Sequence, residues 1–352
     1  PFEYALSTET MKMLNSFEGR VSNADLRATA VSQGTLLDEG TEAGILKGAD
    51  YREGVPATKE GSLIKAGRYL GSKWGGKYLR APDIYCTILE KGKDKLVRLG
   101  DIAEVRFGIK TGANEFFYLD ADKIAEWGIE EEFLKPVIKS PRECKSILIN
   151  PDDLKFKIFM CHKDKKDLKG TRALKYIEWG EKKKFNERPS CRGRGRWWEV
   201  GVRRKPHLMF NYLIDSTAKT LYSSSGCFCS DNFQEIHLPD TNAVALCISL
   251  NSSIFQLMVN MAGRSNFGGG LLKIQTYEVA DLLCLKPGAV RNPTHSVLKG
   301  DSWDVMKVSK DRESLDSVVF ESLGLSQIEQ LSVYQAVKST VNDRLSKAES
   351  IK

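Results

Sequence analysis

The feature that most constrains the fold of this chain is a strongly basic segment, residues 182–205, which no hydrophobic core can absorb. It reads KKKFNERPSCRGRGRWWEVGVRRK and holds ten Lys or Arg residues against only Glu187 and Glu199, a local balance of +8. The whole chain of 352 residues has a formal net charge of +7, so the remainder is nearly neutral. The segment must therefore lie at the surface, where its charge forms a concentrated patch.

The basic segment also contains two adjacent aromatic residues, Trp197 and Trp198. Clustered cations with large rings are typical of a surface that binds a polyanion with stackable bases, which favours nucleic acid over a membrane. The alternative is a solvated, flexible loop whose charge is incidental. Two large rings argue against it, because rings of this size need a core or a stacking partner to cover them, which a solvated loop does not provide.

Within the segment, Arg192, Arg194 and Arg196 alternate with small residues. In an extended conformation all three guanidinium groups would point to one side, which suits phosphates or guanine edges in the major groove. The run at residues 203–205, Arg-Arg-Lys, suits phosphate contacts. In a strand, one tryptophan would face the core and the other would be available to a sugar or a displaced base.

Two glycine-rich loops are further candidates for DNA contact. The loop at residues 108–114 is either a contact loop or a structural turn, and residues 264–273 form either an amide nest for phosphate or a flexible connection. Neither has the spacing of a nucleotide-binding P-loop. The candidate DNA-binding residues are Lys110, Thr111, Asn114, Arg192, Arg194, Arg196, Trp197, Trp198, Arg203, Arg204, Lys205, Arg264, Asn266, Gly268, Gly269, Gly270 and Lys273.

Other classes of site find little support in the sequence. The eight cysteines and four histidines are scattered without a CxxC pair, which predicts no metal site and reduced, buried cysteines typical of a cytoplasmic protein. No grouping of residues makes a convincing catalytic site. The uncharged run at residues 241–263 contains seven Asn, Ser and Gln residues, too many for a membrane span. We expect a buried strand there, a turn at residues 251–253 and then a buried helix.

The C-terminal part has the clearest helical pattern. Apolar residues between Leu315 and Leu323 fit one amphipathic helix that ends at Gly324. Ser326 and Glu329 form a capping box for a second helix, in which apolar residues recur at intervals of three and four.

Upstream, short strands mix with helices without regular alternation, which predicts an α+β fold of mixed short-strand sheets with a C-terminal helical element. We divide the chain into a tail or linker (1–60), a target-binding domain (61–295) and the helical element (296–352).

Several motifs occur in the order in which one family has them. They are WGGKYLRAPDIY (74–85), LGDIAEVRFGIKTGANEFFYL (99–119), RPSCRGRGRWWEV (188–200), ALCISLNSSIF (245–255) and GGGLLKIQTYEVADLLCLKP (268–287). With the final helical stretch they cover roughly residues 60–350. The chain resembles the C-terminal, target-recognition half of adenine-specific DNA methyltransferases of the TaqI-like and Eco57I-like group, which includes fused type II restriction-modification enzymes.

The resemblance implies a TaqI-like specificity domain that recognises duplex DNA, and residues 1–60 would border a catalytic domain. That domain would bind S-adenosylmethionine and methylate adenine at N6. Its Asn/Asp-Pro-Pro-Tyr/Phe motif is missing here, because the nearest string, Asn150-Pro151-Asp152-Asp153, lacks the second proline and the ring.

We therefore expect no catalysis and no cofactor in this chain, with double-stranded DNA and a methyltransferase catalytic domain as partners. Two alternatives stay open: a scaffold that binds RNA or protein, and a chain with residual nuclease or methyltransferase activity.

Overall fold

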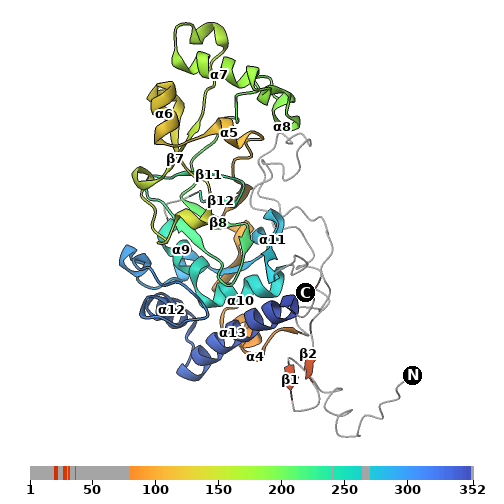
Figure 1. Cartoon of the computed structure of the whole chain (residues 1–352). Coiled ribbons are helices and arrows are strands. Elements are labelled where there is room, and N and C mark those ends of the chain that lie inside the picture. The colour runs from red at the N-terminus through yellow and green to blue at the C-terminus, as the bar shows by residue number, and fades with distance from the viewer. Residues whose placement is uncertain are drawn as a thin grey trace, which may run out of the picture.

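The computed structural model describes residues 20–22, 27–29, 31, 36, 80–239, 242–263 and 270–349. Four candidate residues lie outside these ranges: Arg264, Asn266, Gly268 and Gly269. Most of the predicted tail, residues 1–60, lies outside them as well. The described part forms two stacked lobes (Figure 1), which we call the upper lobe (residues 109–200 with strand β11) and the lower lobe (the other described residues from 80 onward).

The lower lobe is built on a four-stranded antiparallel sheet of order β10-β8-β12-β4. Its strands are β4 (Glu104–Phe107), β8 (Leu208–Asn211), β10 (Thr220–Tyr222) and β12 (Phe233–His237). Alternate residues such as Val105, Phe210 and Ile236 belong to the main hydrophobic core. Strand β4 lies at the edge of this sheet, which leaves Arg106 and Phe107 exposed.

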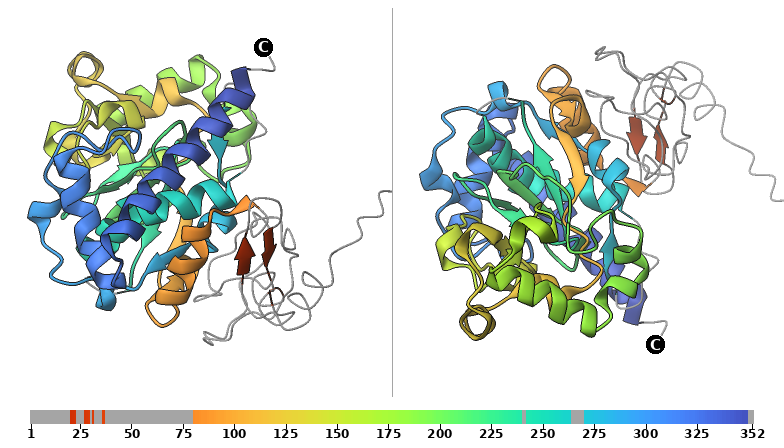
Figure 2. Two further views of the ribbon diagram at one scale, coloured as in Figure 1. Left: turned by 90° about the horizontal axis from the view of Figure 1, so that it is seen from below. Right: turned by 90° about the horizontal axis from the view of Figure 1, so that it is seen from above.

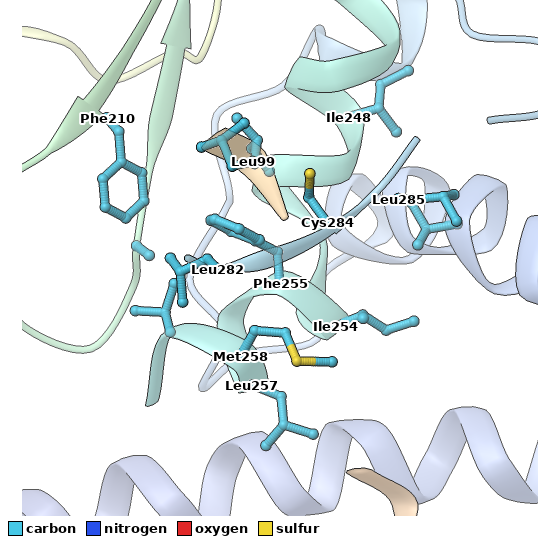
Figure 3. Close-up of a cluster of buried hydrophobic side chains, with 14 of the residues drawn as sticks. Leu99, Phe210, Ile248, Ile254, Phe255, Leu257, Met258, Leu282, Cys284 and Leu285 are labelled. Carbon is cyan, nitrogen blue, oxygen red and sulfur yellow. The ribbon is translucent and has the colours of Figure 1, made fainter. Parts of the chain in front are cut away.

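Helices complete the core of the lower lobe. They are α4 (Asp83–Lys91), α9 (Ala243–Asn251), α10 (Ser253–Ala262), α11 (Thr276–Ala280), α12 (Lys310–Leu323) and α13 (Gln327–Glu349). Figure 3 shows Phe255 and Met258 of α10 among apolar side chains from the sheet and neighbouring segments. Helix α13 packs against both α10 and α4, so the C-terminal helices share this core. The domain boundaries stay predictions.

The uncharged run is helical on both sides of its turn. The prediction of a turn followed by a buried helix is confirmed, because Ser252 separates α9 from α10 and its hydroxyl accepts from the Phe255 amide. The predicted buried strand is wrong, since residues 243–251 form α9. No single helix among the described residues is long and apolar enough to cross a membrane. Helices α9 and α10 together are long and apolar enough, but the chain bends by 65° between them.

The predicted C-terminal helices are confirmed. Helix α12 ends at Gly324, whose φ of 69° is a left-handed conformation that glycine adopts readily. The capping box is present, because the Ser326 amide donates to Glu329 at 2.6 Å and the Glu329 amide donates to the Ser326 hydroxyl at 3.4 Å. The mixture of short sheets and helices confirms the α+β fold class.

The upper lobe has its own small sheet, of order β11-β6-β7-β5, and its own aromatic core. Its elements are β5 (Tyr118–Leu119), β6 (Leu134–Ile138), β7 (Phe156–Phe159), β11 (Phe228–Cys229), α5 (Asn114–Phe117), α6 (Ala121–Trp127), α7 (Arg172–Lys182) and α8 (Pro189–Arg192). The Phe116 ring stacks on Tyr176 with centroids 4.6 Å apart, and the Tyr176 hydroxyl donates to the Phe116 carbonyl at 2.5 Å.

Paired short strands complete the described structure. They are β1 (Arg20–Ser22) with β2 (Arg27–Thr29), β3 (Leu96–Arg98) with β14 (Leu283–Leu285), and β9 (Leu213–Ile214) with β13 (Leu272–Lys273). Helix α8 of the upper lobe and α11 of the lower lobe lie on the same side of the molecule (Figures 1 and 2).

Candidate nucleic-acid interface

The basic segment and the first glycine loop, about eighty residues apart in sequence, are in direct contact. The Arg194 guanidinium donates to the carbonyl oxygens of Lys110 at 3.0 Å and Thr111 at 2.9 Å. The Cys191 thiol donates to the same Thr111 carbonyl at 3.6 Å. Arg194 thus fixes the loop in place, and its guanidinium is occupied within the protein.

The two segments approach so closely that the contact requires glycine. Gly112 has a φ of +75°, and a Cβ atom there would lie 2.5 Å from the Cβ of Ser190. Nearby, Arg188 makes a bidentate pair with Glu115, at 2.7 and 3.2 Å. This pairing lowers the pKa of the Glu115 carboxyl, chiefly because its charged form accepts those hydrogen bonds.

The alternating arginines do not form an extended ribbon. Residues 189–192 form α8, because Pro189 is preorganised for the first helical turn, and turns follow up to Trp198. Arg192 is exposed at the end of α8. Arg196 is held by Asp164 at 2.8 Å and Glu199 at 2.8 Å. The three guanidinium groups therefore do not point to one side, contrary to the expectation from their spacing.

The tryptophan pair belongs to the core of the upper lobe. Trp197 and Trp198 are only 8% and 7% exposed, so the expectation that one ring would be available to DNA is wrong. The Trp197 indole donates to Glu181 at 3.0 Å, and its ring lies 4.6 Å from that of Phe116. A turn, unlike a strand, allows two consecutive rings to enter the same core.

The Arg-Arg-Lys run at residues 203–205 crosses from the upper lobe to the edge strand β4. Arg203 donates to the Phe107 carbonyl at 2.9 Å and lies 3.4 Å from Glu235. Arg204 is 66% exposed, with one Nη atom 3.8 Å from Glu104. Lys205 is exposed, and its ammonium group lies 5.9 Å from the centre of the Phe228 ring.

Lys273, at the end of the second glycine loop, reaches Phe107 through the ring of Tyr212. Lys273 lies over the Tyr212 ring at 5.3 Å, and that ring contacts Phe107 with centroids 5.1 Å apart. Gly270 has a φ of +74°, and its carbonyl accepts from Arg344, so this glycine also has a structural role. Described parts of the three candidate segments therefore lie around residues 107–112: Arg203 contacts Phe107, Arg194 contacts Thr111, and Lys273 reaches Phe107 through the Tyr212 ring.

The first loop has a mixed character. Thr111 is buried at 1% exposure and its hydroxyl donates to the Asn114 side chain, whereas Lys110 and Asn114 are exposed.

Arg106 and Phe107 were not among the residues predicted from the sequence, although both are exposed on the edge strand β4. The available signal was the string EVRF, which directly precedes the first glycine loop. We call the cations around residues 107–112 the junction surface. It consists of Arg106, Lys110, Arg192, Arg204, Lys205 and Lys273.

The first glycine loop does not have the setting of a cofactor loop in a Rossmann-like domain. Rossmann-like cofactor domains need parallel strands joined through helices, but β4, which precedes the first glycine loop, pairs antiparallel with β12. The loop itself is packed against Ser190 and Cys191. Asn150 caps a short turn, since its side chain accepts from the Asp152 amide at 3.4 Å. Among the residues that the structure describes, no three His, Cys, Asp or Glu side chains gather closely enough to hold a metal ion.

The fold is similar to part of a solved restriction endonuclease. The type IIG restriction endonuclease BpuSI aligns with a TM-score of 0.55 and 14% identity, over 77% of this chain and 34% of that one, which shows a shared fold. The type IIL restriction-modification enzyme MmeI, solved with DNA, aligns with a TM-score of 0.37 and 11% identity, over 70% of this chain and 33% of that one, too weakly to support an argument.

The family itself is shown by sequence. The model of the C-terminal domain of the type II methyltransferase M.Eco57I matches residues 71–313, and this chain belongs to that family. It is also 29% identical, over 117 residues, to the type II methyltransferase M.AccI of Acinetobacter calcoaceticus. That match covers 32% of this chain and 21% of the relative, so the chain spans a minor part of the proteins it matches. The predicted resemblance is confirmed.

Proposed function

We propose that this chain recognises duplex DNA for an N6-adenine methyltransferase of a type II restriction-modification system. The catalytic domain that binds S-adenosylmethionine would lie outside this chain, in the same polypeptide or a separate subunit. The observation that carries the proposal is that described parts of three separately predicted segments lie around residues 107–112, through Arg203 at Phe107, Arg194 at Thr111, and Lys273 by way of the Tyr212 ring. This arrangement concentrates exposed cations from β4, α8 and the run at 203–205 around one junction.

The family supports a DNA-directed role, and the charge supports the kind of contact. A surface that neutralises phosphates releases counterions, so its affinity falls steeply as salt rises. We expect the affinity of this chain for duplex DNA to fall about tenfold or more between about 50 and 200 mM salt. The proposal fails if an electrophoretic titration across that range shows no salt dependence.

Two further measurements separate this function from its alternatives. Calorimetry with S-adenosylmethionine should show no binding to this chain, whereas binding would favour residual methyltransferase activity. Competition of labelled duplex with unlabelled duplex, RNA and heparin should rank duplex first. If RNA competes better, the scaffold alternative gains.

A further inference from the structure

A cluster of buried carboxylates lies beneath the junction surface, on the two neighbouring strands β4 and β12. Glu104 is 8% exposed and Glu235 is 1% exposed. In the antiparallel register Glu235 lies opposite Arg106, and His237 lies opposite Glu104. Burying a carboxylate is costly unless it is paired, so these two acids must have partners that compensate for their desolvation.

Glu104 has an arginine at each of its oxygens. Its Oε1 accepts from Nε of Arg106 at 2.5 Å, and Nη2 of Arg106 lies at the same distance. Its Oε2 lies 3.8 Å from Nη2 of Arg204. The Glu104 carboxylate, the anchor of this arrangement, is buried, whereas the side chains of Arg106 and Arg204 are 45% and 66% exposed. The geometry is that of one fixed carboxylate beneath two guanidinium groups that face solvent.

Glu235 fixes the backbone beside this pair. It accepts from Arg203 at 3.4 Å and contacts His237 at 3.1 Å, while Arg203 also donates to the Phe107 carbonyl at 2.9 Å. The side chain of Arg203 therefore fixes the backbone next to Arg204 against the edge strand β4. With His237 counted as neutral, three arginines against two glutamates leave a charge of +1, which matches one phosphodiester.

We propose that Glu104 is a positioning residue that holds Arg106 and Arg204 as a paired site for one phosphate of the DNA backbone. This inference rests on the proposed function and deepens it. Glu104 occupies the Nε–Nη2 edge of Arg106, so Nη1 of Arg106 and most of the Arg204 guanidinium stay open to oxygens of a ligand. The net positive charge of the cluster favours a phosphate over a neutral base, and the test below distinguishes the two. The donors left on two separate side chains suit different oxygens of one phosphate.

The test measures binding of the full chain to two short duplexes, one of mixed sequence and one containing only A·T pairs, over a series of salt concentrations. Arg106→Ala and Arg204→Ala should each weaken binding about tenfold on both duplexes. The double variant should lose little more than either single variant, because both groups act on the same phosphate. Its salt slope should be smaller by about 1.

Glu104→Gln gives the sharpest result, because charge and positioning predict opposite signs. Removal of a negative charge alone would tighten binding to DNA, whereas loss of the anchor should weaken binding severalfold. Glu132→Gln is the matched control: Glu132 pairs with Lys163 in the upper lobe, away from the junction. The control should bind DNA as tightly as the wild-type chain or slightly more so. Thermal unfolding of each variant checks that it is folded.

The outcomes separate this inference from the proposed function. A wild-type chain that binds neither duplex overturns both. Wild-type binding with a steep salt slope, combined with a Glu104→Gln variant that binds equally well or better, overturns the positioning role alone. An Arg204→Ala defect that disappears on the A·T-only duplex means that this arginine reads guanine, and overturns the phosphate assignment. If Glu104→Gln does not fold, the arginine variants, whose side chains face solvent, still decide the phosphate assignment.

Discussion

The contact between the first glycine loop and α8 predicts a specific sensitivity at Gly112. Substitution by alanine places a side chain in the left-handed region, at a φ of +75°, which costs about 1–2 kcal/mol. The new Cβ would also lie 2.5 Å from the Cβ of Ser190, and such overpacking costs a further 1–3 kcal/mol or so. We expect Gly112→Ala to lower the free energy of unfolding by about 2–5 kcal/mol.

Gly170 provides a matched control within the same lobe. Its φ is +85°, but a Cβ atom there would meet nothing within 4 Å. Gly170→Ala should therefore cost only the backbone strain, about 1–2 kcal/mol. The difference between the two variants isolates the close approach of the two segments. Denaturant unfolding followed by tryptophan fluorescence measures it, because Trp197 and Trp198 lie in the core of this lobe.

The same pair of variants tests whether the contact matters for DNA binding. If Ser190 and α8 are pushed away from the loop, Arg192 moves relative to Lys110, and duplex affinity should fall severalfold under conditions where the protein is folded. Gly170→Ala should retain wild-type affinity. Equal destabilisation by both substitutions would refute the reasoning, since it would mean that the two segments separate without cost.

Three further predictions concern the upper lobe and the buried thiols. Trp197→Ala should lower the free energy of unfolding by about 3–5 kcal/mol in the same denaturation assay, and a loss under about 1 kcal/mol would contradict its core role. Burial raises the pKa of Cys144 to about 11 and that of Cys227 to about 12, so both thiols should react with a disulfide reagent far more slowly in native than in unfolded protein near neutral pH. Mapping by mass spectrometry checks this, and rapid native labelling of either residue would contradict it. The hydrogen bond from Arg196 lowers the pKa of Glu199 below its ordinary value, so the stabilisation from this pair is present above the ordinary value and is lost as pH falls through the lowered one. Glu199→Gln should flatten the acid side of the stability profile measured by denaturation, and an unchanged profile would show that this pair contributes nothing.

The sequence predicts the C-terminal helices well because their signals are local. Gly324 is the C-cap that the left-handed turn requires, and Ser326 with Glu329 satisfies the first amides of the next helix. Neither signal depends on what packs against the helices. The α+β class likewise follows from short apolar segments separated by turn residues, which limit the length of each element.

The uncharged run shows where local signals fail. Helix α9 is buried on nearly every side, so its sequence has no polar face to reveal a helical period. A continuous apolar run is equally compatible with a buried strand, and only tertiary contacts decide between them. Asn251 makes one such tertiary contact: its side chain accepts from the Thr220 amide at 3.0 Å and donates to the Thr220 carbonyl at 2.8 Å. Residue spacing cannot predict such a long-range partner.

The sequence indicates which segments stay at the surface better than it indicates which of their side chains are available, and the reason is pairing of charges. Glycine and charge patterns identify segments that stay at the surface, and described parts of three such segments lie around residues 107–112. Which cations stay available depends on acids that lie elsewhere in the sequence. Four of them pair with the basic segment from outside it: Glu104, Glu115, Asp164 and Glu235.

This pairing changes the expected salt dependence. The basic segment alone carries +8, and subtraction of its four external acidic partners leaves +4. At about 0.9 per neutralised phosphate, the slope of log affinity against log salt should be about −3 to −4, whereas the unpaired count would give about −7. A measured slope near −7 would mean that the ion pairs open when DNA binds, so that Arg188 and Arg196 leave their carboxylates. Charge reversal at Glu115, as in Glu115→Lys, then distinguishes the two cases. With intact pairs it both frees Arg188 and adds a lysine, which steepens the slope by about 2, whereas with pairs that open only the lysine is new and the slope steepens by about 1.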